Sequence, residues 1–369
     1  MAGADIQGER PALEVANRGL LTVGVMLAMV VVMLDTTVAN VALPNMQASL
    51  GATFDTVTWV LTSYIIGTAV AMPITGWLSE RISARRLFLI AVAGFIAASM
   101  ACGVATHLEE MVVYRFVQGI TGAFIAPLSQ SVMLDINVPS RQARAMSVWG
   151  MGIMIGPIMG PIIGGWLTEN YNWRWVFYVN LPVGLIAFGL IWWFLPGRPT
   201  SRRSFDLFGF AVLALALSSL QLMLDRGTDQ DWFHSTEIWI EAVLAVSAGW
   251  VFIVHLFTGK NTIISPALVT NANMITAFVF QLVVGLMMMA VMALMPPLLQ
   301  RIYGYDVLDT GLLLAPRGIG VLISMFITGR IVGKIDPRYI IACGLLIAAV
   351  SMWQMTRWSL VMGWQPLVI

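Results

Sequence analysis

Charged residues are scarce in this sequence. Only 11% of the 369 residues are Asp, Glu, Lys or Arg, whereas a soluble domain typically carries about 25%. Hydrophobic residues make up 59% of the chain, and the mean hydropathy is +0.84. Because so little polar surface is available to face water, we expect most of the chain to lie in a lipid bilayer.

Cysteine is also scarce: Cys102 and Cys343 lie far apart, each inside an apolar run. This excludes a disulfide framework and a cysteine-based metal motif. Three histidines, His107, His234 and His255, have no paired ligand or nucleophile in the sequence. No phosphate-binding loop is present, and no basic face accompanies the net charge of +1. We therefore expect no cofactor, no metal, no nucleic-acid partner and no enzymatic activity.

Long apolar runs are abundant instead. Stretches of about twenty apolar residues predict helices that cross a membrane. The eleven predicted spans cover roughly residues 19–43, 57–78, 87–106, 111–134, 145–167, 175–195, 206–224, 238–257, 272–298, 310–329 and 338–356. The first is too long for a cleaved signal peptide, so we expect it to be retained. The sequence predicts an all-α, polytopic membrane protein.

Basic residues alternate between the two sides of these spans. With a cytoplasmic N-terminus, fourteen fall on the cytoplasmic side and four on the outer side. The fourteen are Arg10, Arg18, Arg81, Arg85, Arg86, Arg141, Arg144, Arg198, Arg202, Arg203, Lys260, Arg330, Lys334 and Arg338. Because Lys and Arg are retained on the cytoplasmic side, this bias predicts a cytoplasmic N-terminus.

The sequence contains an internal repeat. Residues 67–76 read GTAVAMPITG and residues 320–329 read GVLISMFITG, at an offset of 253. Such duplication is typical of transporters built from two helix bundles. We predict a six-helix N-terminal bundle at 1–195, a linker with two extra helices at 196–270, and an incomplete C-terminal bundle of three helices at 271–369. On this count three helices are missing, which favours a truncated chain.

Six motifs occur in order along the spans. They are LDTTVANVALP (34–44), GWLSERISARR (76–86), RFVQG (115–119), GMGIMIGPIMGPIIGG (150–165), NWRWVFYVNLPVG (172–184) and SLQLMLDRG (219–227) followed by DWF. Together they resemble the major facilitator superfamily, its fourteen-helix drug:proton antiporter branch, and the EmrB type of efflux permease within that branch. The loop motif departs from the family pattern at Glu80, Ser83 and Ala84, where aspartate, glycine and arginine are usual.

The resemblance implies a function and partners. It implies proton-coupled export of hydrophobic or cationic drugs across the inner, cytoplasmic membrane. It also implies a periplasmic adaptor (membrane fusion) protein and an outer-membrane channel as partners. Two alternatives stay open at this point: an exporter of a single metabolite such as a siderophore or fatty acid, and a truncated membrane scaffold that transports nothing.

Two ionisable residues lie inside predicted spans and are candidates for proton coupling. Asp35 lies well within the first span, where a carboxylate costs several kcal/mol and is usually functional. Arg115 begins the motif that the resemblance associates with proton coupling, and its guanidinium stays charged in proteins. Either residue could instead serve helix packing alone. The sequence leaves open whether the two side chains meet.

Polar and aromatic side chains within the spans are candidate linings of a substrate cavity. They are Thr37, Asn40, Trp59, Tyr64, Gln118, Gln130, Asn180 and Gln281, with the run Met287 to Met289. Methionine and aromatic surfaces suit varied hydrophobic substrates because they repack easily. Each of these residues taken alone is better explained by packing in the core or by contact with lipid.

Two further groups are candidates for gating. Glu80, Arg81 and Arg85 follow the second span and could lock one conformation, or simply anchor the loop on the cytoplasmic side. In the fifth span four glycines recur every four residues with two prolines between them: Gly152, Gly156, Gly160 and Gly164, with Pro157 and Pro161. This spacing places bare backbone on one helix face and allows close approach of another helix, either for gating or for ordinary packing.

Overall fold

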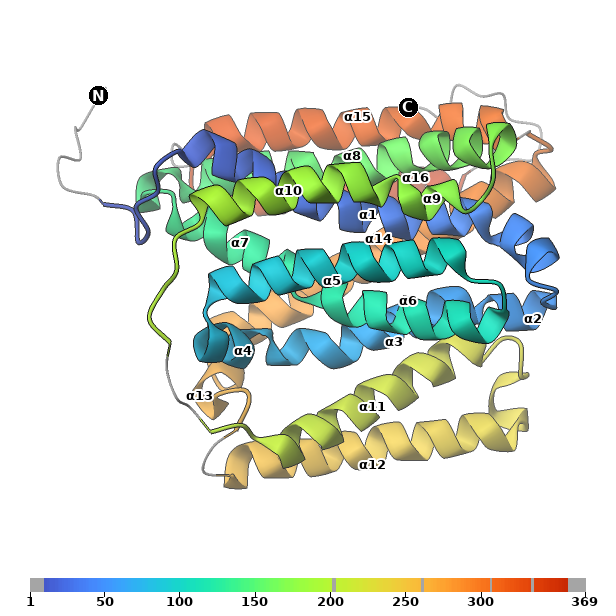
Figure 1. Cartoon of the computed structure of the whole chain (residues 1–369), viewed down its shortest axis with the longest axis horizontal. Helices are drawn as coiled ribbons and strands as arrows, with labels where there is room; N and C mark the ends of the chain where they lie inside the picture. The colour runs from blue at the N-terminus through green and yellow to red at the C-terminus, as the bar shows by residue number, and fades with distance from the viewer. Residues whose placement is uncertain (1–9, 201–203, 260–261, 306, 333–334, 358–369) are drawn as a thin grey trace. The chain divides into compact units, whose positions relative to one another are not determined.

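The computed structural model of the chain describes residues 10–200, 204–259, 262–305, 307–332 and 335–357. Within those ranges the chain is helical and contains no strand. The helices are α1 Arg18–Ser49, α2 Phe54–Val57, α3 Trp59–Ala71, α4 Thr75–Ile82, α5 Ala84–Val104, α6 Leu108–Ala123, α7 Ile125–Asp135, α8 Pro139–Asn170, α9 Trp175–Tyr178, α10 Asn180–Phe194, α11 Leu207–Arg226, α12 Thr236–Thr258, α13 Pro266–Val269, α14 Ala272–Pro297, α15 Val307–Ile331 and α16 Pro337–Met355. The predicted all-α fold is confirmed (Figure 1).

In the described part of the chain, nine helical segments are long and apolar enough to cross a bilayer. Three of these segments contain a break: α3 continues into α4 through a 3-10 turn at Met72–Ile74, α6 into α7, and α9 into α10. The two remaining predicted spans correspond to α14 and α15. Every predicted span therefore coincides with a helix, and the chain is a multi-pass membrane protein.

The chain divides into two compact units. One contains residues 10–136 and 155–266, and the other contains residues 137–154 and the described part of 267–369. The helix α8 runs without interruption from the second unit into the first, and continues through Pro157 and Pro161. The division predicted at residues 195 and 270 stays a prediction.

Close helix contacts define the core of the larger unit. The α3 helix lies beside α6, and α5 packs on the other side of α6 (Figure 1). A side chain at Gly67 would overlap the carbonyl oxygen of Phe116, and one at Gly119 would overlap that of Tyr64. The Thr68 hydroxyl donates to the Gly119 carbonyl at 3.2 Å. Glycine at these two positions lets the backbones of α3 and α6 touch, as small residues do in membrane helices.

The two extra helices, α11 and α12, form a hairpin that packs on α3 through α11 (Figure 1). The Thr62 hydroxyl of α3 donates to the Asp225 carboxylate. Arg226 pairs with Glu237 of α12, and its guanidinium lies 5.6 Å from the ring centre of Trp59. Polar contacts at one end thus attach the hairpin to the bundle, while most of its apolar surface stays exposed.

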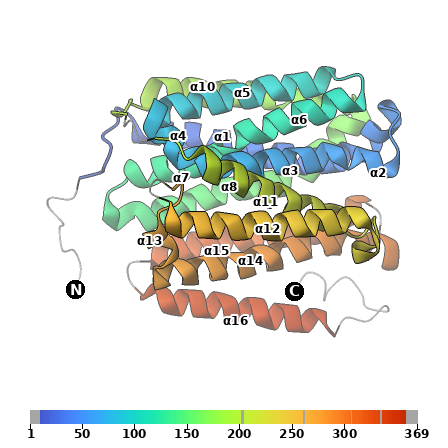
Figure 2. The ribbon, with the colours of Figure 1, turned by 90° about the horizontal axis from the view of Figure 1, so that it is seen from below.

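The smaller unit contains α13 to α16 and the first part of α8; Figure 2 shows α14, α15 and α16 as long helices. A side chain at Gly150 of α8 would crowd Met325 of α15, and one at Gly329 would crowd Ser147. Glycine therefore again permits close packing of two helices. The most apolar stretch of α16 has no buried residue.

Candidate functional site

Asp35 and Arg115 meet in the interior of the larger unit. Asp35 lies in the middle of α1 and Arg115 in the middle of α6. The Arg115 Nη1 atom donates to Asp35 Oδ2 at 2.5 Å, and each side chain is only 1% exposed. The question that the sequence leaves open is answered by this contact: the two candidates form a buried ion pair.

The second carboxylate oxygen of Asp35 is held by two amides. Gln118 Nε2 and Asn180 Nδ2 each donate to Asp35 Oδ1 at 2.8 Å. Asn180, on α10, also donates to the Ser99 hydroxyl of α5 at 3.0 Å, and that hydroxyl donates to the Phe177 carbonyl at 2.9 Å. Together with Arg115, three N–H donors therefore surround the two carboxylate oxygens.

The Arg115 guanidinium is also satisfied from several sides. Its Nε donates to the Val60 carbonyl at 3.1 Å, and Nη1 donates to Gln118 Oε1 at 2.8 Å. The guanidinium carbon lies 4.4 Å from the ring centre of Tyr64 and 5.8 Å from that of Phe177. A buried guanidinium needs such acceptors and aromatic faces to offset the loss of water.

Six helices supply this network. Side chains of α1, α5, α6 and α10 contribute, α3 adds the Val60 carbonyl and the Tyr64 ring, and α9 adds the Phe177 carbonyl and ring. Because the pair joins these helices, a change in the charge of Asp35 alters contacts to all of them at once. Protonation of Asp35 would replace an acceptor by a donor and leave Arg115 without its counter-ion. The arrangement thus links the charge of one carboxylate to the contacts of several helices.

Ser99 and Cys102 of α5 are part of the site and are absent from the sequence-based candidates. Ser99 is fully buried and receives the Asn180 amide, and the Cys102 thiol donates to Gln118 Oε1 at 3.6 Å. The two residues lie three positions apart in a helix, so they share a face. That spacing of small polar side chains inside an apolar run is the sequence signal that could have found them.

The other predicted cavity residues are distributed differently. Tyr64 is buried over Arg115, while Trp59 is half-buried under Arg226. The side chains of Asn40, Gln130 and Gln281 are exposed. Asn40 donates to the Thr36 carbonyl of its own helix at 2.9 Å. Gln281 belongs to the smaller unit. Gln118, Asn180 and Tyr64 therefore gather around the ion pair, whereas the other side chains do not contact it.

The glycines of α8 line one buried face. Gly152, Gly156, Gly160 and Gly164 are all buried. A Cβ atom at Gly156 would overlap Met33, one at Gly160 would overlap the Thr37 hydroxyl, and one at Gly164 would press on Val38. Thr37 donates to the Gly156 carbonyl at 3.3 Å. The second part of α8 thus packs backbone-to-helix against the segment of α1 that carries Asp35.

The loop motif adopts an unusual backbone conformation between α4 and α5. Ser83 has a φ of 76°, a region that favours glycine, and this is the position where the family usually has glycine. A non-glycine residue there costs of order 1–3 kcal/mol. Glu80 and Arg81 are exposed, while Arg85 donates to the Trp192 carbonyl of α10 at 2.6 Å. Arg85 is therefore bound within the larger unit in this conformation.

An all-α multi-pass fold with a charged pair sealed among its helices is typical of membrane transporters. A family model described as Major Facilitator Superfamily matches residues 25–369. The chain belongs to the Major Facilitator Superfamily, which confirms the resemblance found in the six motifs.

Individual relatives agree with this assignment. The chain is 37% identical to the "Multidrug export protein EmrB" of Escherichia coli (strain K12), covering 94% of this chain and 68% of that protein. It is 35% identical to the "Fatty acid resistance protein FarB" of Neisseria gonorrhoeae, covering 94% of this chain and 69% of the relative.

Solved structures share the fold. A peptide transporter POT in complex with sulfate matches with a TM-score of 0.59 at 16% identity, covering 95% of this chain and 78% of the other. The proton:xylose symporter XylE matches with a TM-score of 0.56 at 14% identity, covering 86% and 69%. At these identities the likeness concerns the fold alone.

Proposed function

We propose that this protein exports hydrophobic or cationic drugs in exchange for protons. The observation that carries the proposal is the buried pair of Asp35 and Arg115 in a transporter fold. An intramembrane carboxylate with a fixed partner is the group expected to take up and release the coupling proton. The multidrug export relatives support the choice of drugs as substrates.

The proposed exchange works through the charge of one carboxylate. In the ionised state Asp35 ties Arg115, Gln118 and Asn180 together, and the helices that carry them are held closed around it. When a proton neutralises Asp35, the pair loses its electrostatic attraction and these helices can separate. Substrate and proton then bind alternately, because each favours a different arrangement of the same helices.

The gating and cavity residues have roles within the same proposal. The Gly156, Gly160 and Gly164 face of α8 permits sliding against α1, because no side chain obstructs the contact. Thr37 lies at that contact, next to Asp35 on α1. Trp59, Asn40 and Gln130 contact the substrate in the larger unit, and Gln281 is a substrate contact of the smaller unit. Glu80, Arg81 and Arg85 hold the closed end in one state.

The proposed membrane location rests on the distribution of basic residues, and the proposed partners rest on the resemblance to EmrB-type permeases. We place the chain in the inner, cytoplasmic membrane with a cytoplasmic N-terminus, because basic residues concentrate in the loops of that side. A periplasmic adaptor protein and an outer-membrane channel complete the export route in this proposal. The bundles at 1–195 and 271–369, joined by 196–270, are its rocking halves.

A second candidate is favoured by the relative named for fatty acid resistance, which is almost as similar to this chain as the drug exporter. Under this alternative the substrate is a fatty acid, which is hydrophobic and carries a negative charge. Both candidates use the same proton-coupling pair, so the choice concerns the substrate alone.

Transport by everted membrane vesicles tests the proposal. We expect vesicles carrying the protein to take up ethidium when a proton gradient is imposed and to stop when the gradient is collapsed. Asp35→Asn should abolish the gradient-dependent part. Glu169→Gln is the matched control, because Glu169 is an exposed carboxylate at the end of α8. A competing fatty acid distinguishes the two substrates. Full gradient-driven uptake by Asp35→Asn would reject the proposal.

A further inference from the structure

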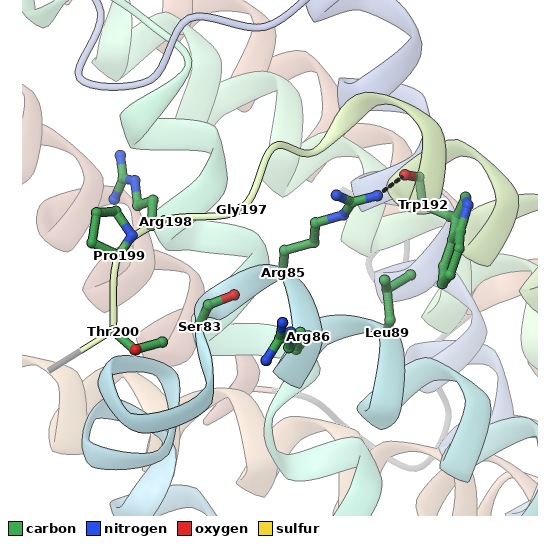
Figure 3. Close-up of a pocket in the computed structure, with 9 residues that line it drawn as sticks. All are labelled: Ser83, Arg85, Arg86, Leu89, Trp192, Gly197, Arg198, Pro199 and Thr200. Atoms are coloured by element: carbon green, nitrogen blue, oxygen red, sulfur yellow. Dashed lines mark hydrogen bonds between the residues drawn. The ribbon is translucent and has the colours of Figure 1, made fainter. Parts of the chain in front are cut away.

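A separate cavity lies at the start of α5, away from the ion pair. It has a volume of about 530 Å³ and is enclosed by residues from two segments. Ser83, just before α5, and Arg85, Arg86 and Leu89 of its first turns line one side. The other side consists of Trp192, near the end of α10, and of Gly197, Arg198, Pro199 and Thr200 in the loop after it. Figure 3 shows residues 197–200 facing the start of α5, and both segments belong to the larger unit.

The cavity is strongly positive. Three of its nine lining residues are arginines and none is acidic. Arg198 pairs with Asp135 at 2.9 Å, whereas Arg85 and Arg86 have no carboxylate partner in the described part of the chain. Arg85 Nη2 donates to the Trp192 carbonyl (Figure 3), and Arg85 Nε is buried without a hydrogen-bond acceptor. Two guanidinium charges at one cavity therefore lack a counter-ion.

The backbone at the start of α5 adds to the positive potential of the cavity. The 21-residue helix α5 begins at this cavity without a side-chain cap from Ser83, and its first turn contains no acidic residue. Its free N–H groups and the positive end of the helix dipole therefore favour an anion in the same place as the two arginines. Arginine binds phosphate in bidentate fashion through its planar fork.

Exposed apolar side chains occur in the two helices that border the cavity. Trp192, which lines it, is 55% exposed; its chain neighbour Trp193 is 80% exposed, and Ile90, next to the lining residue Leu89, is 58% exposed. Tryptophan gathers at the level of lipid headgroups, where an aromatic ring contacts both acyl chains and polar groups. A phospholipid with its phosphate in the cavity and its acyl tail over these side chains would match both the positive charge and the exposed apolar surface.

We propose that this cavity binds the phosphate group of an anionic phospholipid. In the orientation proposed above, the lipid belongs to the cytoplasmic leaflet, whose negative surface attracts basic segments of proteins. Arg85 and Arg86 bind the phosphate, the start of α5 adds N–H donors, and the lipid tail lies over Trp192 and Ile90. The site shares Arg85 with the proposed gate, and none of its lining residues belongs to the proton-coupling pair.

Native mass spectrometry of the purified full chain tests the proposal. The probes are phosphatidylglycerol, phosphatidylcholine and inorganic phosphate, each titrated separately and the last also as a competitor. Arg86→Gln removes an exposed charge at the cavity, and Thr200→Glu places a carboxylate into it. Arg18→Gln is the matched control, since Arg18 is an exposed cation at the start of α1 that does not line the cavity.

We expect phosphatidylglycerol to bind more tightly than phosphatidylcholine, and each cavity variant to weaken phosphatidylglycerol binding about fivefold. Arg18→Gln should change it less than twofold. Equal weakening by Arg18→Gln would overturn the proposal, because it would mean diffuse attraction to surface charge. Unchanged binding by Arg86→Gln and Thr200→Glu would overturn it too. Displacement of the lipid by inorganic phosphate, without any preference for phosphatidylglycerol, would reject the lipid as the source of the phosphate.

Discussion

The buried ion pair makes a quantitative prediction about stability. Asp35→Asn leaves the Arg115 guanidinium without a counter-ion at a site that is 1% exposed. It also turns one carboxylate oxygen into an N–H donor, which then faces either the Arg115 donor or the donors of Gln118 and Asn180. Removing one partner of a buried pair costs about 3–5 kcal/mol of unfolding free energy. Arg115→Gln should lower the unfolding free energy by a similar amount, because it leaves the buried Asp35 carboxylate without a counter-ion.

The double variant Asp35→Asn with Arg115→Gln removes both charges together. No buried charge is then uncompensated, and what remains is the loss of hydrogen bonds and of the contact with the Tyr64 ring. We expect this loss to be about 1–3 kcal/mol. The double variant should therefore be more stable than either single variant, and the two single effects should exceed the double effect by at least about 3 kcal/mol.

Unfolding of the purified protein in mixed micelles, followed by loss of helical circular dichroism as the denaturing detergent increases, measures these free energies. Wild type, both single variants and the double variant form one thermodynamic cycle. Additive effects, within about 0.5 kcal/mol, would mean that the two side chains do not interact. Such a result would refute the reasoning from the buried pair.

Three further predictions concern neighbouring contacts. Gly160→Leu should abolish vesicle transport because its side chain would overlap α1, whereas Gly165→Leu, which meets no atom within 4 Å, should transport normally. Thr62→Val removes the hydroxyl that ties α3 to α11 and should speed proteolytic cleavage of the loop between α11 and α12, at a cost of about 1 kcal/mol. Asn180→Leu removes one donor of the central carboxylate and should lower the unfolding free energy by about 1–3 kcal/mol, measured in the same micelle titration.

Much of the fold was predictable from the sequence, because apolar runs of membrane length have one stable form in lipid. All eleven predicted spans are helices. The candidates Asp35 and Arg115 were identifiable since charge inside a span is costly and needs a reason. Gln118 follows Arg115 by three residues on the same helix face, and its position beside the pair follows from helix periodicity.

The rest of the site depends on tertiary packing. Asn180 reaches the carboxylate from α10 and is itself held by Ser99 of α5, and nothing local in the sequence fixes how those two helices are rotated. Helix rotation also explains Gln130. This polar residue was predicted to line the cavity, but its side chain is exposed. The backbone breaks within α3–α4, α6–α7 and α9–α10 were also not visible as interruptions of the apolar runs.

The closure of the Asp35 network has a consequence for energy conservation in the cell. In the proposed exchange, a carboxylate that is 1% exposed, with both oxygens hydrogen-bonded, is closed off from both aqueous phases until the surrounding helices part. We therefore expect idle copies in the membrane not to dissipate the electrochemical gradient that the cell maintains.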